Sequence, residues 1–145
     1  MTRRRLFAAG GAALLLGLAI ASPAYSQDKP EAVAQKTAEF WLALVDAGRY
    51  AESWEAASTS FKAAVGVVKW QDTAKRVRAP LGKVLSRKLD SAQFVKNPPQ
   101  AAPGDYVFLT YDTSFQKKAV TEIIVPILDK DGHWRVSTYT IKAAP

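Results

Sequence analysis

The sequence contains no cysteine and only one histidine among its 145 residues. Zinc and copper sites are built mainly from these two side chains, so the usual ligand sets for both metals are excluded. Without cysteine there is also no disulfide and no lipid-modified cysteine anchor. We therefore expect a domain that is stabilised by its core alone and that carries no cofactor.

The short motifs of nucleotide binding and acyl transfer are missing as well. The chain has no glycine-rich phosphate loop, no nucleophile elbow and no Cys–His pair. Residues 129–132, Asp-Lys-Asp-Gly, are similar to the start of a calcium loop, but the twelfth position from Asp129 is Thr140 in place of Glu. We interpret this segment as a hairpin turn and predict no metal site.

A long apolar run stands at the N-terminus, behind three arginines. Residues 2–5 form a positively charged segment with three arginines, and Leu6 to Ala21 is an apolar stretch of about 16 residues. Residues 22–27 then offer small residues at the −3 and −1 positions of a cleavage site. A membrane-spanning helix needs about 20 residues, so we predict a signal peptide over 1–26, with a retained membrane anchor as the alternative. Residues 2–7 also fit the twin-arginine export pattern, and the general secretory route stays open.

Removal of this leader leaves one domain, residues 27–145, which we expect to be exported and periplasmic. The whole chain has 20 basic and 13 acidic residues, and the leader holds three of the arginines, so the mature charge falls from +7 to 17 minus 13, or +4. This charge suits solubility and attracts anionic surfaces only weakly. Export also argues against a nucleic-acid partner, and we expect no transmembrane segment in the mature chain.

The first half of the mature chain shows helical periodicity. Apolar residues recur at steps of three and four from Glu31 to Val45, and Gly48 stands where a helix C-cap is expected. A second short helix is predicted over 50–57. A third helical region begins after the cap cluster at 58–60 and ends before Pro80, and Gly66 allows it to be either one helix or two.

The second half changes to the two-residue period of strands. We predict strands over 84–95, 105–115, 119–128 and 134–141, with a loop at 97–104 and the tight turn at 129–132. Helices followed by strands indicate an α+β fold with an antiparallel sheet of about four strands.

Several motifs in this order carry a family resemblance. They are Phe40-Trp41-Leu42, Asp46-Ala-Gly48-Arg-Tyr50 through Trp54, Trp70, Arg78-Ala-Pro80-Leu-Gly82-Lys-Val84 with Ser86-Arg87, Tyr106-Val107, Tyr111-Asp112-Thr113-Ser-Phe115, and Asp131-Gly132-His-Trp134-Arg-Val136 with Tyr139 and Ile141. The chain resembles domain-of-unknown-function family 4019 over essentially its whole mature length. The resemblance implies a small exported bacterial protein with a nuclear-transport-factor-2-like (cystatin-like) cone, in which helices pack on the concave face of a curved sheet. It implies no activity.

Enzymes of that superfamily use a pocket carboxylate surrounded by aromatic residues, which suggests candidates for chemistry. An apolar pocket raises the pKa of a carboxylate and lets it act as a base near neutral pH. Asp112 is the first choice for such a base, with Tyr111 or Tyr139 as hydrogen-bond donor. The structural alternative is that Asp112 caps the turn after its strand.

The remaining candidates for a pocket are aromatic or titratable. Trp54 and Trp70 would form its apolar walls, and Glu122 and His133 are weaker candidates for the base. The alternative for the aromatic residues is a place in the core, where large rings most often lie.

One basic segment has no acidic residue between Asp72 and Asp90. Its cations are Lys75, Arg76, Arg78, Lys83, Arg87 and Lys88. They would suit an anionic partner such as a lipid headgroup, a cell-wall polymer or an acidic protein surface. The alternative is a solvated helix end followed by the polar face of a strand.

The strand at 119–128 is apolar on both faces and therefore needs two covering layers. The helices would cover one face. A second copy of the chain would cover the other in a sheet-to-sheet homodimer, unless the N-terminal segment or the 97–104 loop wraps over it.

Taken together, these features favour a non-enzymatic binding or protein-interaction module of the bacterial envelope. The alternatives are a small-molecule isomerase or lyase with Asp112 in its pocket, and an envelope-associated protein that uses the basic segment.

Overall fold

The structure, a computed structural model, describes residues 27–145; the predicted signal peptide, residues 1–26, lies outside the described residues. The elements are α1 (Pro30–Asp46), α2 (Tyr50–Glu55), α3 (Thr59–Ala64), α4 (Val67–Arg78), a 3-10 turn (Ala79–Leu81), β1 (Val84–Lys96), β2 (Asp105–Phe115), β3 (Ala119–Leu128) and β4 (Trp134–Ala143). The predicted order of helices followed by strands is confirmed.

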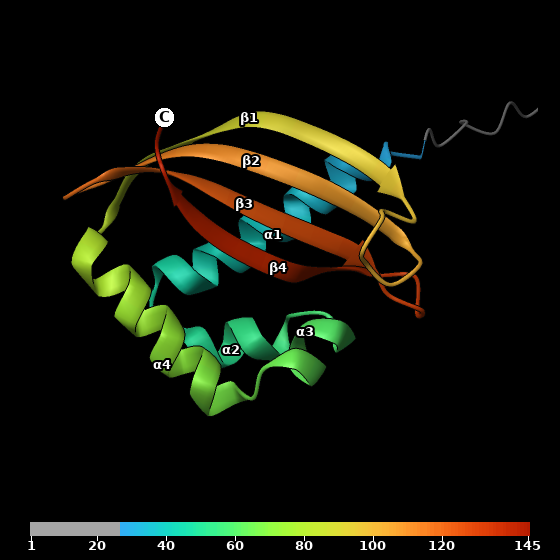
Figure 1. The fold of residues 1–145 in the computed structure, drawn as a ribbon, viewed down its shortest axis with the longest axis horizontal. Coiled ribbons are helices and arrows are strands. Elements are labelled where there is room, and N and C mark those ends of the chain that lie inside the picture. The colour runs from blue at the N-terminus through green and yellow to red at the C-terminus, as the bar shows by residue number, and fades with distance from the viewer. Residues whose placement is uncertain (1–26) are drawn as a thin grey trace, which may run out of the picture.

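The four strands form one antiparallel sheet in the order β1-β2-β3-β4. The sheet curves over α1, and α2, α3 and α4 lie on the same side as α1 (Figure 1). The predicted α+β class with a four-stranded antiparallel sheet is therefore confirmed.

Local sequence signals explain where the helices begin and end. Pro30 occupies the first turn of α1, and Gly48 follows the helix with a φ of 73°, a left-handed conformation that glycine adopts without strain. The Ser58 side chain caps α3 by accepting a hydrogen bond from the backbone N–H of Phe61 at 3.1 Å. Val65 has an extended backbone after α3. The helical region after residues 58–60, for which one helix or two were predicted, therefore consists of two helices.

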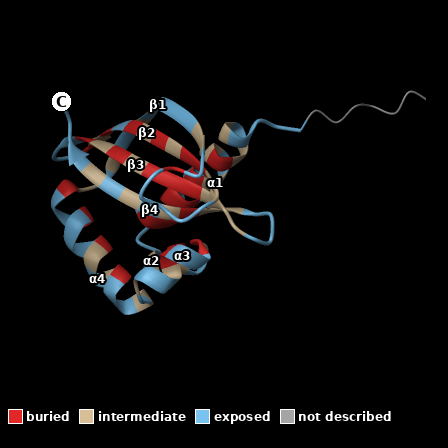
Figure 2. Ribbon diagram, turned by 45° about the vertical axis from the view of Figure 1, so that its right-hand side comes forward, coloured by how far each residue is buried: buried red, intermediate tan, exposed pale blue. Residues whose placement is uncertain are grey.

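The core lies between α1 and the concave face of the sheet. Alternate residues of β2, including Val107, Leu109 and Tyr111, face it and are buried. Figure 2 shows the matching buried stripes on the sheet and on the helix faces turned toward it. Trp41 of α1 stacks against Trp70, with ring centroids 5.6 Å apart, and this aromatic cluster closes the space beneath the sheet.

The convex face of the sheet is partly covered by the chain itself. The Tyr106 hydroxyl donates to the backbone oxygen of Ala102 at 2.8 Å, and the backbone at Gly104 lies close to Tyr106 and Ile127. Loop 97–104 thus covers one end of this face, as one of the sequence alternatives expected. Ile123 remains half-buried beyond it, and the homodimer through the sheet stays a prediction.

Within residues 27–145, no helix is long and apolar enough to cross a membrane.

Candidate functional site

The most concentrated charged group on the concave side is a buried ionic cluster, which we define as Asp46, Arg78, Arg87, Thr113, Glu122 and Tyr139. Glu122 is its centre. This residue lies on β3 between the inward-facing residues Val120 and Ile124, and its side chain is completely buried. A carboxylate in this position needs charged partners and several hydrogen bonds to remain ionised.

Glu122 receives hydrogen bonds from three strands and an ion-pair partner from one helix. The Arg87 Nε of β1 donates to Glu122 Oε1 at 2.7 Å, and the Thr113 hydroxyl of β2 donates to the same oxygen at 2.6 Å. The Tyr139 hydroxyl of β4 donates to Oε2, and an Arg78 terminal nitrogen of α4 lies 3.6 Å from that oxygen. Both carboxylate oxygens are therefore occupied by protein donors.

Asp46, the last residue of α1, supplies the second carboxylate that faces Arg78 and Arg87. Arg87 binds its carboxylate with two nitrogens, at 2.8 and 3.1 Å, and Arg78 donates to it as well. Burial alone would raise the pKa of Asp46, but the hydrogen bonds from Arg87 and Arg78 lower it below its usual range. Two guanidinium groups thus face two carboxylates, and the cluster is electrically neutral.

Tyr139 places its phenol hydroxyl between Glu122 and Arg78. Burial and the negative charge of Glu122 raise the pKa of its hydroxyl, while the charge of Arg78 opposes that rise. The hydroxyl accepts a hydrogen bond from Arg78 at 2.9 Å while it donates to Glu122. This arrangement holds the phenol neutral and fixed, so it joins parts of the fold and does not supply a free acid or base.

Asp112, the first choice for a catalytic base, lies elsewhere. It is exposed on the convex face of β2, where its neighbours across the strands are Lys88 and Thr121. Tyr111 and Tyr139 face the opposite, concave side. The structure therefore does not bring the three residues together in an apolar pocket, because adjacent residues of a strand point to opposite faces.

The two tyrosines proposed as donors differ in their surroundings. Tyr139 belongs to the ionic cluster, whereas Tyr111 is 2% exposed and its hydroxyl has no hydrogen-bond partner. Burial and the charge of Glu39 raise the pKa of Tyr111. An unpartnered buried hydroxyl is costly, which gives this residue a testable role in stability.

The candidate wall residues are both anchored by hydrogen bonds. Trp54 is partly buried, and its Nε1 donates to the backbone oxygen of Val65 at 2.7 Å. Trp70 Nε1 donates to the Ser53 hydroxyl at 2.9 Å, and its ring lines a hollow. His133 is exposed at the tip of the β3–β4 hairpin. Of the two tryptophans, Trp70 is therefore the one placed beside a hollow.

The basic segment does not form one surface. Arg78 and Arg87 point inward into the ionic cluster, with side chains 6% and 15% exposed. The other four cations, Lys75, Arg76, Lys83 and Lys88, are exposed. The six cations therefore do not share one surface, because Arg78 and Arg87 pair with Asp46 and Glu122. An anionic partner for the basic segment stays a prediction.

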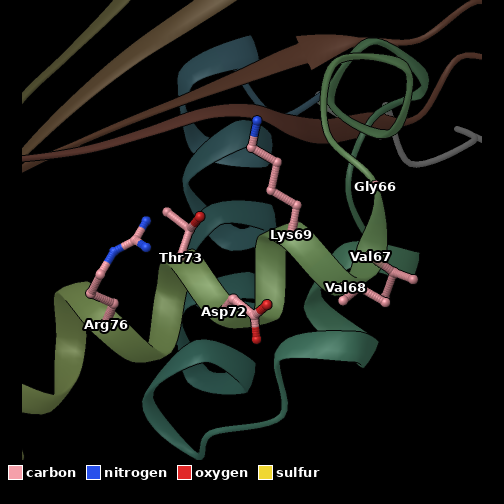
Figure 3. A pocket seen from close by; sticks show the side chains of 7 residues that line it. All are labelled: Gly66, Val67, Val68, Lys69, Asp72, Thr73 and Arg76. Atoms are coloured by element: carbon pink, nitrogen blue, oxygen red, sulfur yellow. The ribbon is translucent and has the colours of Figure 1, made fainter.

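Surface hollows lie beside the helices. One of about 240 Å³ runs between α4 and β4 and is lined by Trp70, Thr73, Ala74, Val77, Arg78, Tyr139, Thr140 and Ile141. A wider one of about 670 Å³ lies on the outer side of α4, where Lys69, Thr73 and Arg76 extend from one side of the helix (Figure 3). Two more, of about 500 and 450 Å³, flank Phe40 on α1.

The sequence gives no indication that Asp46 pairs with Arg78 and Arg87, and it places Glu122 only among the weaker candidates for a base. A signal for Glu122 was present, because the two-residue period of β3 places it between Val120 and Ile124 on the buried face. The arginine partners could not be read in the same way, since they come from α4 and β1. Among residues 27–145 no group of three or more metal-ligating side chains comes together.

Comparison with known proteins adds a family but no activity. The family model described as "Protein of unknown function (DUF4019)" matches residues 37–139. No curated protein and no solved structure matches the chain. The matched region includes every member of the ionic cluster and most of the chain, and so this protein belongs to the DUF4019 family.

Proposed function

We propose that this protein is a non-enzymatic binding module of the bacterial envelope, exported by its N-terminal leader and folded as a nuclear-transport-factor-2-like domain. One observation carries the binding role. Of the four large apolar side chains that are exposed in the described residues, Phe40, Val68 and Val77 lie on helices, and each borders a surface hollow. An apolar group at the rim of a concave surface offers a contact to a binding partner.

The ionic cluster supports the non-enzymatic half of the proposal. Its carboxylates are engaged by arginine, threonine and tyrosine donors, so neither is positioned to accept a proton from a ligand. General base catalysis needs a carboxylate within hydrogen-bond reach of a substrate. The isomerase or lyase alternative, which placed Asp112 in a pocket, has no such support because Asp112 is exposed on the convex face.

Photo-crosslinking in the envelope of living cells tests the proposal. A benzophenone amino acid would replace Phe40, Val68 or Val77 in turn, and Lys130 at the exposed hairpin turn would serve as the control position. We expect a discrete crosslinked species from at least one of the first three positions and none from Lys130. The absence of a discrete product at all three positions, or measured turnover of a small molecule, would overturn the proposal.

A second candidate, envelope association through cations, is favoured by Lys75 and Lys83. Both line a hollow of about 230 Å³ at the end of α4, beside Gln116. Binding to vesicles that contain anionic lipid should then fall as salt screens the charges. If the Lys75→Glu variant bound to these vesicles as strongly as the wild type, this candidate would be wrong.

A further inference from the structure

β4 is an edge strand of the sheet. The strand pairs with β3 on one side, and among residues 27–145 no strand pairs with its other side. An edge strand presents unpaired backbone N–H and C=O groups, which form a template for an additional strand. Near its start this edge is partly used, because the N–H of Ser58 donates to the backbone oxygen of Val136 at 2.9 Å.

The remaining part of β4 is regular. Residues 138–143 pair with 120–125 without a break, and the register shift lies before them, between Val125 and Pro126. The other edge strand, β1, differs because it carries two register shifts along its length. Bulges discourage the addition of a strand, so β4 is the edge that can accept one.

A helix runs beside that regular edge and forms the second wall of a groove. Trp70, Thr73, Ala74 and Val77 line the hollow from α4, and Tyr139, Thr140 and Ile141 line it from β4. Spacings of three, four and seven residues place the four α4 residues on one face of the helix. Val77 remains 42% exposed at this face, so an apolar contact is available to an incoming chain.

The size of the hollow indicates what it accepts. A volume of about 240 Å³ is below the roughly 300–1,000 Å³ of typical small-molecule sites. It suits one or two side chains of a peptide, which would alternate between the groove and solvent as they do in any strand. Recognition of this kind combines backbone hydrogen bonds with a few side-chain pockets.

Charge around the groove selects among peptides. Lys69 and Arg76 flank Thr73, which lines both this groove and the hollow on the outer side of α4, and Lys142 follows the groove residue Ile141 on β4. All three cations are exposed, against one exposed acidic residue on α4, Asp72. The charge that remains is positive, and an acidic segment would be attracted to it.

We propose that the groove between α4 and the edge of β4 binds an extended segment of a partner protein, with alternating apolar and acidic residues, as a fifth strand of the sheet. The inference rests on the proposed function and names its partner class. The segment lies along residues 138–143, places an apolar side chain against Trp70 and Val77, and directs acidic side chains toward Lys69, Arg76 and Lys142.

A fluorescent nonapeptide library with alternating apolar and acidic residues tests this directly. Fluorescence anisotropy measures affinity for the purified protein, and backbone amide NMR locates the site. We expect saturable binding and shifts concentrated in residues 138–143. N-methylation of every second backbone nitrogen of the peptide removes the N–H donors needed for strand pairing and should abolish binding. Replacement of the acidic residues of the peptide by lysine should weaken binding at least tenfold.

Two exposed apolar residues provide a matched pair of variants. Val77→Asp should weaken binding at least tenfold, whereas Leu85→Asp should leave it unchanged, because Leu85 is 66% exposed and lies on β1, at the opposite edge of the sheet from β4. Thermal unfolding of both variants would show that each is folded.

The outcomes separate this inference from the proposed function. Failure of the whole library to bind, shifts located around Phe40 or on the convex face, or equal affinity of the two variants would overturn the edge-strand inference. Crosslinking at position 40 or 68 would still support the binding module. Concentration-dependent dimerisation that Val77→Asp abolishes would assign the groove to a second copy of the chain and overturn the peptide partner.

Discussion

Arg87 on β1 and Glu122 on β3 are joined across the intervening strand β2 by a bond of 2.7 Å between Arg87 Nε and Glu122 Oε1. The β2 residue beneath this contact, Thr113, pairs with Arg87 in register and donates its hydroxyl to the same oxygen. Three strands are thus tied together on the concave face by side chains as well as by backbone. The stability of the sheet should depend on this contact far more than on any surface ion pair.

Glu122→Gln should destabilise the protein by about 3–5 kcal/mol, because it leaves two buried arginines opposite one carboxylate. Urea unfolding followed by tryptophan fluorescence would measure the loss. Asp112→Asn, on the exposed convex face of the sheet, is the control and should change the free energy of unfolding by less than about 0.5 kcal/mol. A Glu122→Gln protein as stable as the control would contradict the central role of Glu122.

Arg87→Lys should be costly although it keeps the charge. A lysine cannot reproduce the two nitrogens on Asp46 and the third on Glu122. We expect a loss of about 2 kcal/mol, the scale of a lost hydrogen bond to a charged group. Lys88→Arg, the neighbouring exposed cation, should have almost no effect in the same unfolding assay. Equal stability of the two variants would show that charge alone suffices at position 87.

Removal of a hydroxyl should have opposite consequences at the two buried tyrosines. Tyr139→Phe deletes a donor to Glu122 and an acceptor for Arg78, and should lower the free energy of unfolding by about 1–3 kcal/mol. Tyr111→Phe deletes a hydroxyl that has no partner and should be neutral or stabilising. Thermal unfolding of both variants and the wild type would measure the two changes in stability. A Tyr111→Phe variant less stable than the wild type would show that the Tyr111 hydroxyl has a hydrogen-bond partner.

Acid should weaken the fold through Asp46. Its pKa is lowered in the folded state, so its contribution is complete above the unfolded value of about 3.9 and is lost as pH falls through the folded value. Asp46→Asn should be less stable than wild type at pH 7 and should show a flatter dependence of stability below about pH 4. Parallel slopes for the two proteins in that range would contradict the assignment.

Gly82 and Gly66 should respond differently to alanine. Gly82 has a φ of 75°, and an added Cβ would lie 2.8 Å from Gln116 Oε1, which accepts the Lys83 N–H. Gly82→Ala should therefore cost about 1–3 kcal/mol, whereas Gly66, with no atom within 4 Å of an added Cβ, should tolerate the change. Chemical denaturation of both variants would test the difference.

Much of the fold could be predicted from local patterns. The apolar spacing of α1, Gly48 after it, and the alternation of Val107, Leu109 and Tyr111 in β2 are short-range signals, and the structure confirms them. The split between α3 and α4 was left open, because a single glycine weakens a helix without ending it.

The candidate site was less predictable because its parts are distant in the chain. Arg78 and Arg87 look like members of a surface patch in sequence, and only the packing of α4 and β1 against β3 turns them inward. The sequence analysis ranks Asp112 above Glu122 as the candidate base, whereas neighbours across the strands decide which carboxylate is buried.

The ionic cluster also constrains the order in which the chain can fold. Asp46, Arg78 and Arg87 precede Glu122 and Tyr139, which come from the last two strands. During synthesis the two arginines therefore leave the ribosome before Glu122. Burial of their charges without this carboxylate is unfavourable, so we expect both side chains to stay hydrated until β3 and β4 are complete. We therefore expect the helices to close against the sheet only after β3 and β4 have been synthesised.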